Sequence, residues 1–212
     1  MTLCFLLTES NFYSKEAIKN YRKVGKVYNY SKKFKEFDKI NVLIIRLSIN
    51  INKSFLHKFH NLKYILSPTT GLNHIDLNYC KKYSIKVISL NNVTKLIQNV
   101  NSTAELTIGL ILSLNRNIVK ANNKTKNNKE WTRYPYISDN IDSKSIGIIG
   151  MGRIGEKVAH ICLSMGLKIY YYDTKKIITN KKFKRTSLKY LLKYSDIITL
   201  HLNYSCDNEN FL

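Results

Sequence analysis

Short apolar runs alternate along this chain with stretches in which apolar residues recur at helical spacing. Runs rich in Ile, Leu, Val and Tyr, a composition typical of buried strands, occur at residues 3–7, 24–28, 42–46, 64–67 and 86–89. Helical spacing occurs between them, at residues 15–21, 55–59 and 76–83. Strands that alternate with helices predict an α/β fold with a parallel sheet covered on both faces.

A longer helix is predicted after this first group of elements. Ser102 and Glu105 have the spacing of a capping box, with Ser102 as the N-cap, and the helix is expected to run to about Ala121. Apolar residues lie nearly all round it, so it is expected to be buried on most sides, between domains or subunits. Residues 122–129 are rich in Asn and Lys, and we expect them to form a solvated irregular segment.

The strongest local signal is a β-branched run at residues 145–149 that leads into three glycines spaced G-x-G-x-x-G. Gly150 permits a tight turn, and Gly152 allows a pyrophosphate to approach the backbone. Gly155 allows the following helix, predicted over residues 158–165, to pack closely on the strand. The free N–H groups at the start of that helix favour an anion. The pattern therefore predicts a dinucleotide-binding turn, and the alternative is a glycine-rich turn without a ligand.

A second apolar run, at residues 167–172, ends in Asp173. An acidic residue at about this distance from the glycines can accept hydrogen bonds from the adenosine ribose. Asp173 favours NAD over NADP because its carboxylate would repel a 2′-phosphate, although Lys175 and Lys176 would partly offset that repulsion. The alternative is that Asp173 is a turn residue at a strand end.

The last predicted elements follow a lysine-rich loop. They are a short helix over residues 188–192 and a strand over residues 196–202. In a doubly wound sheet this strand would lie beside the glycine strand, at the switch point where such sheets bind ligands.

Composition changes this picture little. The net charge of +21 suggests a nucleic-acid partner, but the excess is mostly lysine and is spread along the whole chain. A nucleic-acid role is therefore the least favoured hypothesis, and it predicts DNA binding with a steep salt dependence. No apolar run reaches the roughly 18 residues of a membrane span. The four cysteines (Cys4, Cys80, Cys162 and Cys206) lack metal-binding or C-x-x-C spacing, which indicates a reducing cytoplasm and no metal site.

Four motifs, in this order, resemble those of the D-isomer-specific 2-hydroxyacid dehydrogenases, the family that includes phosphoglycerate dehydrogenase. The matching segments are Thr70-Gly71-Leu72-Asn73-His74-Ile75-Asp76-Leu77, Thr103-Ala104-Glu105 with Arg116-Asn117, Gly147 to Gly155, and Ser195 to His201. The resemblance covers nearly the whole chain, and four motifs in the correct order are far more specific than any one of them.

The resemblance implies two Rossmann or flavodoxin-like domains with parallel sheets. Residues 1–100 would form part of a substrate domain, and residues 101–212 an incomplete NAD-binding domain. NAD and a 2-hydroxy or 2-oxo acid would bind in the cleft between them. Family members are commonly dimers or larger, with the long helix in the interface, so a complete chain is expected to form a homodimer.

The resemblance also implies roles for particular residues. The cofactor-binding residues would be Gly150, Gly152, Arg153, Ile154, Gly155, Asp173, Thr103, His201 and Leu202. The substrate-binding residues would be Arg46, Thr70, Gly71 and Asn99. Arg46 and Asn99 match places that contact the substrate anion in phosphoglycerate dehydrogenases, and the alternative for Arg46 is a surface arginine at a strand end.

Two departures from the family pattern stand near the end of the sequence. Asn203 replaces the usual proline. The catalytic Arg, Glu and His of the family would lie beyond Leu212, and none of the five histidines here has the catalytic motif around it. The expectation is therefore a truncated dehydrogenase that is inactive alone, with an exposed apolar edge at its last strand. The alternative is a non-catalytic dinucleotide-binding or interaction module.

Overall fold

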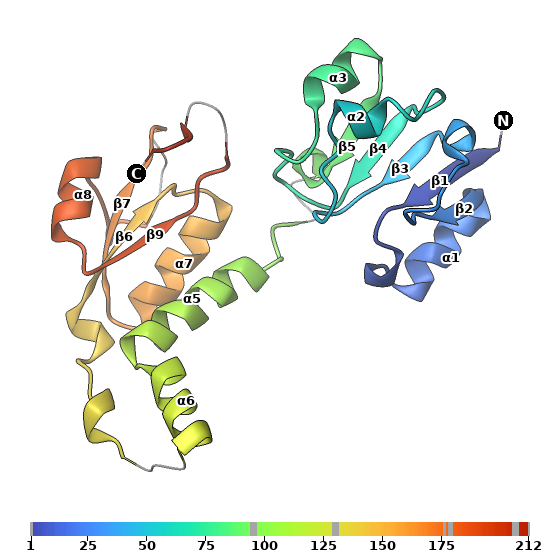
Figure 1. Ribbon diagram of the computed structural model, residues 1–212. Coiled ribbons are helices and arrows are strands. Elements are labelled where there is room, and N and C mark those ends of the chain that lie inside the picture. Colours follow the sequence, from blue (N-terminus) through green and yellow to red (C-terminus); the bar gives the residue numbers. More distant parts are fainter. Residues whose placement is uncertain are drawn as a thin grey trace. The chain divides into compact units, whose positions relative to one another are not determined.

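The chain folds into two compact α/β units, each built on one parallel sheet. The computed structural model describes residues 2–93, 97–128, 132–175, 177, 180–204 and 208–211 (Figure 1). One unit comprises Met1–Ile97 with Tyr204–Leu212, and the other comprises Gln98–Asn203. Lys176 and Cys206, both considered above, lie outside the described residues.

The first unit contains a five-stranded parallel sheet with the order β2-β1-β3-β4-β5. Its strands are β1 (Leu3–Leu7), β2 (Gly25–Asn29), β3 (Val42–Ile44), β4 (Tyr64–Ser67) and β5 (Lys86–Ser89). Its helices are α1 (Lys15–Val24), α2 (Lys53–Leu56) and α3 (Leu77–Lys82), with 3₁₀ turns η1 (Ser10–Phe12), η2 (Phe37–Lys39) and η3 (Leu90–Val93). These elements confirm the α/β pattern read from the apolar runs, with shifts of a few residues at their ends.

Successive side chains of a strand point to opposite faces, so the apolar runs place apolar side chains on both faces of this sheet. Leu6 and Leu43 belong to a cluster that includes Phe55 and Leu56 of α2. Their neighbours in sequence, such as Leu7, pack on the opposite face with residues of α1. A parallel sheet covered on both faces is the arrangement that the sequence predicts.

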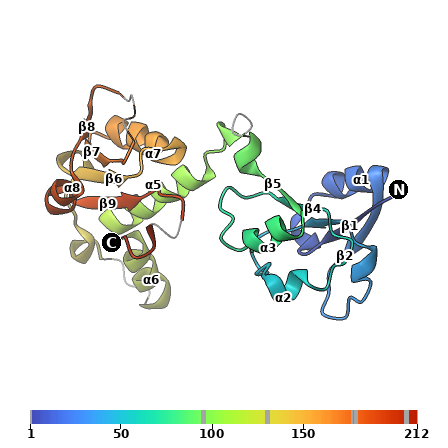
Figure 2. The same cartoon turned by 90° about the horizontal axis from the view of Figure 1, so that it is seen from above.

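The second unit contains a four-stranded parallel sheet with the order β8-β7-β6-β9, which Figure 2 shows from top to bottom. Its strands are β6 (Ser145–Ile149), β7 (Lys168–Tyr172), β8 (Phe183–Arg185) and β9 (Ile197–Leu200). Its helices are α5 (Ser102–Asn115), α6 (Ile118–Asn128), α7 (Arg153–Ser164) and α8 (Leu188–Tyr194), with 3₁₀ turns η4 (Tyr134–Tyr136) and η5 (Ile141–Ser143). Strand β9 pairs directly with the glycine strand β6, which confirms the predicted neighbour.

The core of this unit explains why β6 is buried along its whole length. Ile146 and Ile148 pack with Val158 and Ala159 of α7, and all four side chains are fully buried. On the other face, α8 packs against Gly147, where a Cβ atom would lie 2.5 Å from the Leu191 side chain. Figure 1 shows α5 and α7 on one side of the sheet and α8 on the other.

The long helix differs from its prediction in its cap and in its length. Asn101, and not Ser102, is the N-cap, and it makes no side-chain capping hydrogen bond, so the capping box is wrong. The helix ends at Asn115 because Asn117 adopts a φ of +53°, a left-handed conformation that asparagine tolerates and that interrupts an α-helix. Helix α6 then runs through most of the segment that was expected to be irregular.

Within the second unit α5 is mostly exposed, so its expected burial between domains or subunits stays a prediction. Ala104 and Ile111 are its buried residues. Leu106, Leu110 and Leu114 are 63%, 56% and 80% exposed. The helix therefore carries an apolar face that the second unit by itself leaves open to solvent.

The cysteines of the described part carry free thiols at positions 4, 80 and 162. Burial raises the pKa of Cys80 and of Cys162 to about 11, so these two thiols stay protonated near neutral pH. No helix within the described ranges is both long enough and apolar enough to cross a membrane.

Candidate functional site

The turn after β6 needs glycine at its first position. Gly150 has a φ of +92°, which L side chains rarely adopt. A Cβ atom there would lie 2.8 Å from the His201 carbonyl oxygen and 2.8 Å from the Leu202 side chain. The Gly150 N–H donates to the Tyr172 carbonyl at 2.9 Å, which joins the turn to the end of β7. The structure therefore brings Gly150, His201 and Leu202 together.

The other two glycines of the motif differ from each other. A Cβ atom on Gly155 would lie 2.1 Å from the Gly150 carbonyl oxygen, so α7 can pack on the turn only without a side chain there. A Cβ atom on Gly152 would have no described atom within 4 Å, and its φ of −79° suits any residue. The fold thus requires glycine at 150 and 155 but not at 152. A ligand that approaches the backbone would account for the glycine at 152.

Asp173 lies at this turn, with both carboxylate oxygens held by backbone donors. Its Oδ2 accepts from the Met151 N–H at 2.8 Å, and its Oδ1 accepts from the Lys175 N–H at 2.8 Å. Each carboxylate oxygen can accept a further hydrogen bond. The carboxylate is therefore fixed beside the glycine turn with acceptor capacity that two ribose hydroxyls can use.

The start of α7 supplies hydrogen-bond donors to the same place. The helix begins at Arg153, and its first intrahelical hydrogen bond runs from the Glu156 N–H to the Gly152 carbonyl at 2.9 Å. The N–H groups of the first turn have no intrahelical acceptor and carry the positive end of the helix dipole. The Arg153 side chain donates to the Val100 carbonyl at 2.9 Å, whereas Ile154 packs into the core.

Two further predicted cofactor residues line a groove between α5 and the edge strand β9. Thr103 lies on the first turn of α5, and His201 follows β9; the groove they share has a volume of about 710 Å³. The His201 N–H donates to the Ile149 carbonyl at 2.8 Å, and its Nε2 lies 3.0 Å from Thr199 Oγ1. Burial lowers the pKa of His201, so the ring is neutral near pH 7.

Three of the four predicted substrate residues lie in the first unit, after the carboxyl ends of β3 and β4. Arg46 donates to the Phe12 carbonyl at 3.1 Å and lies 5.5 Å from the centre of the Phe12 ring. The Thr70 carbonyl accepts from Asn91 at 2.5 Å, and the Gly71 carbonyl accepts from a threonine hydroxyl at 2.8 Å. The fourth residue, Asn99, belongs to the second unit and is exposed.

One residue beside the glycine turn is not indicated by any sequence pattern. Arg185 ends β8, and its Nη2 donates to the Asp173 carbonyl at 2.7 Å. No pattern marks it, because Phe183–Arg185 is a three-residue strand inside a lysine-rich segment that looks like a loop. Parallel pairing of β8 with β7 is what places Arg185 near Asp173.

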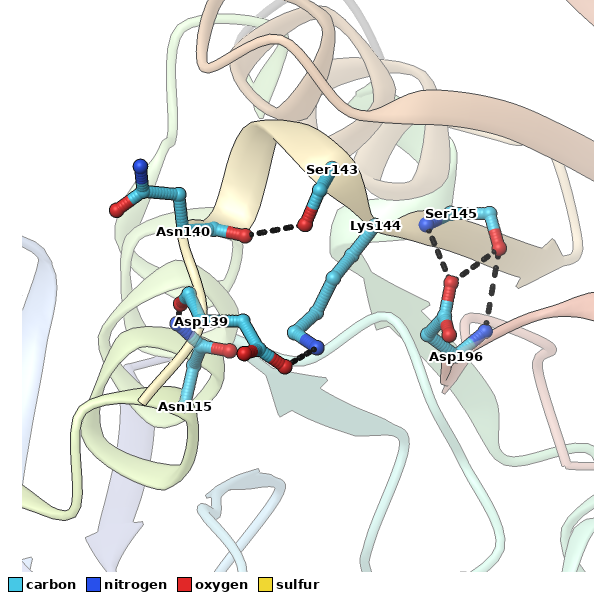
Figure 3. Close-up of polar contacts among 7 residues, drawn as sticks. All are labelled: Asn115, Asp139, Asn140, Ser143, Lys144, Ser145 and Asp196. Atoms are coloured by element: carbon cyan, nitrogen blue, oxygen red, sulfur yellow. Dashed lines mark hydrogen bonds and ion pairs between the residues drawn. The ribbon is translucent and has the colours of Figure 1, made fainter. Parts of the chain in front are cut away.

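A separate polar cluster fixes the opposite end of β6 and β9 (Figure 3). Asp196 Oδ2 accepts from the Ser145 N–H and from Ser145 Oγ, each at 2.7 Å. Lys144 forms an ion pair with Asp139 at 3.2 Å. The hydrogen bonds from Ser145 hold the pKa of Asp196 below its ordinary value. This cluster sets the register of the edge strand and lies away from the glycine turn.

We expect the Asp196→Asn variant to lose a small part of its stability in a pH-dependent manner. Because the folded-state pKa is depressed, the stabilisation is present above the ordinary value of 3.8 and disappears as the pH falls through the folded-state pKa. The aspartate is exposed, so the loss should be about 1 kcal/mol or less near neutral pH. Urea melts of both proteins between pH 2 and pH 7 would measure it. A difference in unfolding free energy that stays constant from pH 2 to pH 7 would contradict a depressed pKa of Asp196.

Comparison with known proteins identifies relatives for both units. Residues 108–212 match the family model described as "D-isomer specific 2-hydroxyacid dehydrogenase, NAD binding domain". The chain is 29% identical over 182 residues to a D-3-phosphoglycerate dehydrogenase of Bacillus subtilis, covering 84% of this chain and 33% of that protein. It is 32% identical over 163 residues to a hydroxypyruvate reductase of Thermotoga maritima, covering 77% of this chain and 51% of that protein.

A solved structure agrees with these relatives. The D-lactate dehydrogenase of Aquifex aeolicus, crystallised with NAD and lactic acid, has a TM-score of 0.81 and 29% identity. That match covers 96% of this chain and 62% of the other. The chain thus spans a third to a half of the length of the two curated relatives above.

Proposed function

This chain belongs to the D-isomer specific 2-hydroxyacid dehydrogenase family, and on that premise we propose that it provides the NAD-binding surface of an NAD-dependent oxidoreductase. The main observation that supports the proposal is the difference in the space around the three glycines. The fold requires Gly150 and Gly155, whereas the open space at Gly152 suits a pyrophosphate that contacts the backbone. Asp173, fixed beside the same turn, supplies the ribose acceptor.

Each predicted residue has a role in this proposal. The N–H groups at the start of α7, from Arg153 and Ile154, bind the pyrophosphate together with the glycine backbone. His201 and Leu202, which lie against Gly150, border the adenosine. Thr103 lies near the phosphate on the nicotinamide side. NAD, when bound, supplies a hydride acceptor, and the residues of this chain position it.

We further propose that the first unit binds a small 2-hydroxy or 2-oxo acid. Arg46 offers a guanidinium that matches a carboxylate or a phosphate group, and Thr70 and Gly71 lie on a neighbouring loop at the same edge of the sheet. Asn99 is a further candidate contact. The relatives and the solved structure are named for different acids, so the proposal specifies the chemical class and not one acid. It assigns no proton-transfer residue to this chain.

We also propose that the chain divides near residue 100 into a substrate domain and a nucleotide domain. We propose in addition that the protein forms a homodimer. The exposed leucines of α5 support the dimer, because a solvated apolar helix face is typical of a subunit interface. Sedimentation of the protein would test it.

The experiment that tests the proposal is a calorimetric titration, in which the heat of binding is measured as NAD is added to the purified protein. Binding with one site per chain would support the assignment, and no heat at millimolar NAD would refute it. A parallel assay of NADH formation from 2-hydroxy acids would distinguish a dehydrogenase from a module that only binds the dinucleotide. Turnover indicates a dehydrogenase, and binding without turnover indicates a dinucleotide-binding module.

We expect the Asp173→Asn variant to bind NAD about tenfold more weakly, because a charged acceptor of ribose hydroxyls is lost. NADP should be affected less, because the same change removes the charge that repels its 2′-phosphate. Dissociation constants for both dinucleotides would measure this. Asp139→Asn is the matched control, since Asp139 is an exposed aspartate in an ion pair with Lys144. An unchanged ratio of the two constants would mean that Asp173 does not contact the ribose.

A further inference from the structure

Arg185 occupies a place at the sheet edge that bears on the choice of dinucleotide. Strand β8 runs parallel to β7, and Arg185 is paired with Tyr171, two residues before Asp173. The Thr186 N–H donates to the Tyr171 carbonyl at 2.9 Å, which continues this pairing past the end of β8. Arg185 and Asp173 therefore emerge at the same carboxyl edge as the glycine turn.

The Arg185 guanidinium is held over the end of β7. Its Nη2 donates to the Asp173 backbone carbonyl at 2.7 Å, and the residue is exposed to solvent. A guanidinium has five N–H donors in a planar fork, and this hydrogen bond uses one of them. With respect to the described residues, the other donors are available to an anion that binds next to Asp173.

The Asp173 carboxylate is itself surrounded by donors. Its two oxygens accept from the backbone N–H groups of Met151 and Lys175. Lys175, two residues after Asp173, is exposed and carries an ammonium group. Arg185, which is hydrogen-bonded to the Asp173 carbonyl, and Lys175, two residues along the chain, add two positive charges to the segment that carries this carboxylate, so the local field is not the repulsive field of an isolated carboxylate.

The neighbouring lysine of the same strand faces elsewhere. Successive residues of a strand point to opposite faces. The Lys184 ammonium lies 5.9 Å from the centre of the Tyr170 ring and 5.6 Å from that of the Tyr190 ring, on the face covered by α8. It therefore does not share the site of Arg185.

We infer that Arg185, with Lys175, lets this site accept the 2′-phosphate of NADP, so that the chain binds both NAD and NADP. In a dinucleotide-binding sheet the acidic residue after the second strand marks the position of the ribose 2′-oxygen. An arginine next to that position can form a charge-assisted, bidentate contact with a phosphate. This inference rests on the proposed NAD-binding function and names Arg185 as the residue that sets its specificity.

The test compares dissociation constants for NAD and NADP in the wild type and in Arg185→Gln. In the wild type we expect the two constants to agree within about tenfold. Arg185→Gln should raise the NADP constant about tenfold and leave the NAD constant within about twofold. Arg185→Lys keeps the charge but loses the planar fork, so it should retain only part of the affinity for NADP and lie between the wild type and Arg185→Gln. Lys184→Gln is the matched control, because it removes one charge from the same strand and should change neither constant.

The outcomes separate this inference from the function on which it rests. If NAD binds but NADP does not, or if Arg185→Gln behaves like Lys184→Gln, the inference fails and the proposed function stands. If neither dinucleotide binds to the wild type, both fail. Circular dichroism and melting curves of each variant would establish that a lost affinity does not reflect a lost fold.

Discussion

Replacement of Gly152 by alanine should abolish most of the dinucleotide affinity and leave the fold intact. A Cβ atom at this position has no described atom within 4 Å, and the backbone conformation is one that alanine adopts without strain. The stability should therefore stay within about 1 kcal/mol of the wild type, since restricting the unfolded chain and changing the N-cap have small, opposed effects. The added methyl group would occupy the space that a pyrophosphate needs, and a displacement of about 1 Å can cost about 100-fold.

The measurement is a pair of calorimetric titrations with NAD, accompanied by melting curves. Gly109→Ala is the matched control, because Gly109 also has open space around it but lies on α5, away from the turn. That control should bind NAD normally and gain about 0.5–1 kcal/mol, since alanine is the better helix residue. Normal NAD binding by Gly152→Ala would show that no pyrophosphate contacts the backbone at this position.

The features that the sequence predicts correctly are those that depend on short local patterns of residues. Buried strands of a parallel sheet are continuous apolar runs, so β1, β4, β5 and β6 agree with the predicted bounds. The pairing of β6 with β9 followed from the general topology of doubly wound sheets.

The features that the sequence does not predict depend on tertiary structure or on single backbone conformations. The break after α5 rests on one left-handed asparagine, Asn117, inside a pattern that is otherwise helical. Strand β8 is three residues long and forms only because β7 offers an edge, so Arg185 could not be assigned to the site from sequence. The open face of α5 is apolar in sequence whether or not a second chain covers it.

The three glycines of the G-x-G-x-x-G motif are of two kinds. The motif alone cannot separate glycines that the fold requires from a glycine that a ligand requires. The structure separates them: Gly150 and Gly155 are in contact with each other, whereas a Cβ atom added at Gly152 would have open space around it. Substitutions at the two kinds of position should therefore fail in different ways.

Replacement of Gly155 by alanine is expected to destabilise the second unit by about 3 kcal/mol or more. The new Cβ atom would lie 2.1 Å from the Gly150 carbonyl oxygen, a backbone atom that no rotamer change can move. Relief requires a shift of α7 away from the turn by about 1 Å, in a core packed too closely to absorb it. Val158, Ala159 and Cys162 of α7 are fully buried, so the shift would open the contacts that hold the helix on β6.

Differential scanning calorimetry would measure the effect, as a fall in melting temperature of roughly 12 °C or more for a unit of this size. Gly152→Ala is the control, because it adds the same methyl group three residues away without a clash. Loss of NAD binding is expected in both variants, but only Gly155→Ala should lose it together with stability. A Gly155→Ala protein with an unchanged melting temperature would mean that α7 does not pack on the glycine turn as described, and the assignment of the pyrophosphate to that turn would lose its structural basis.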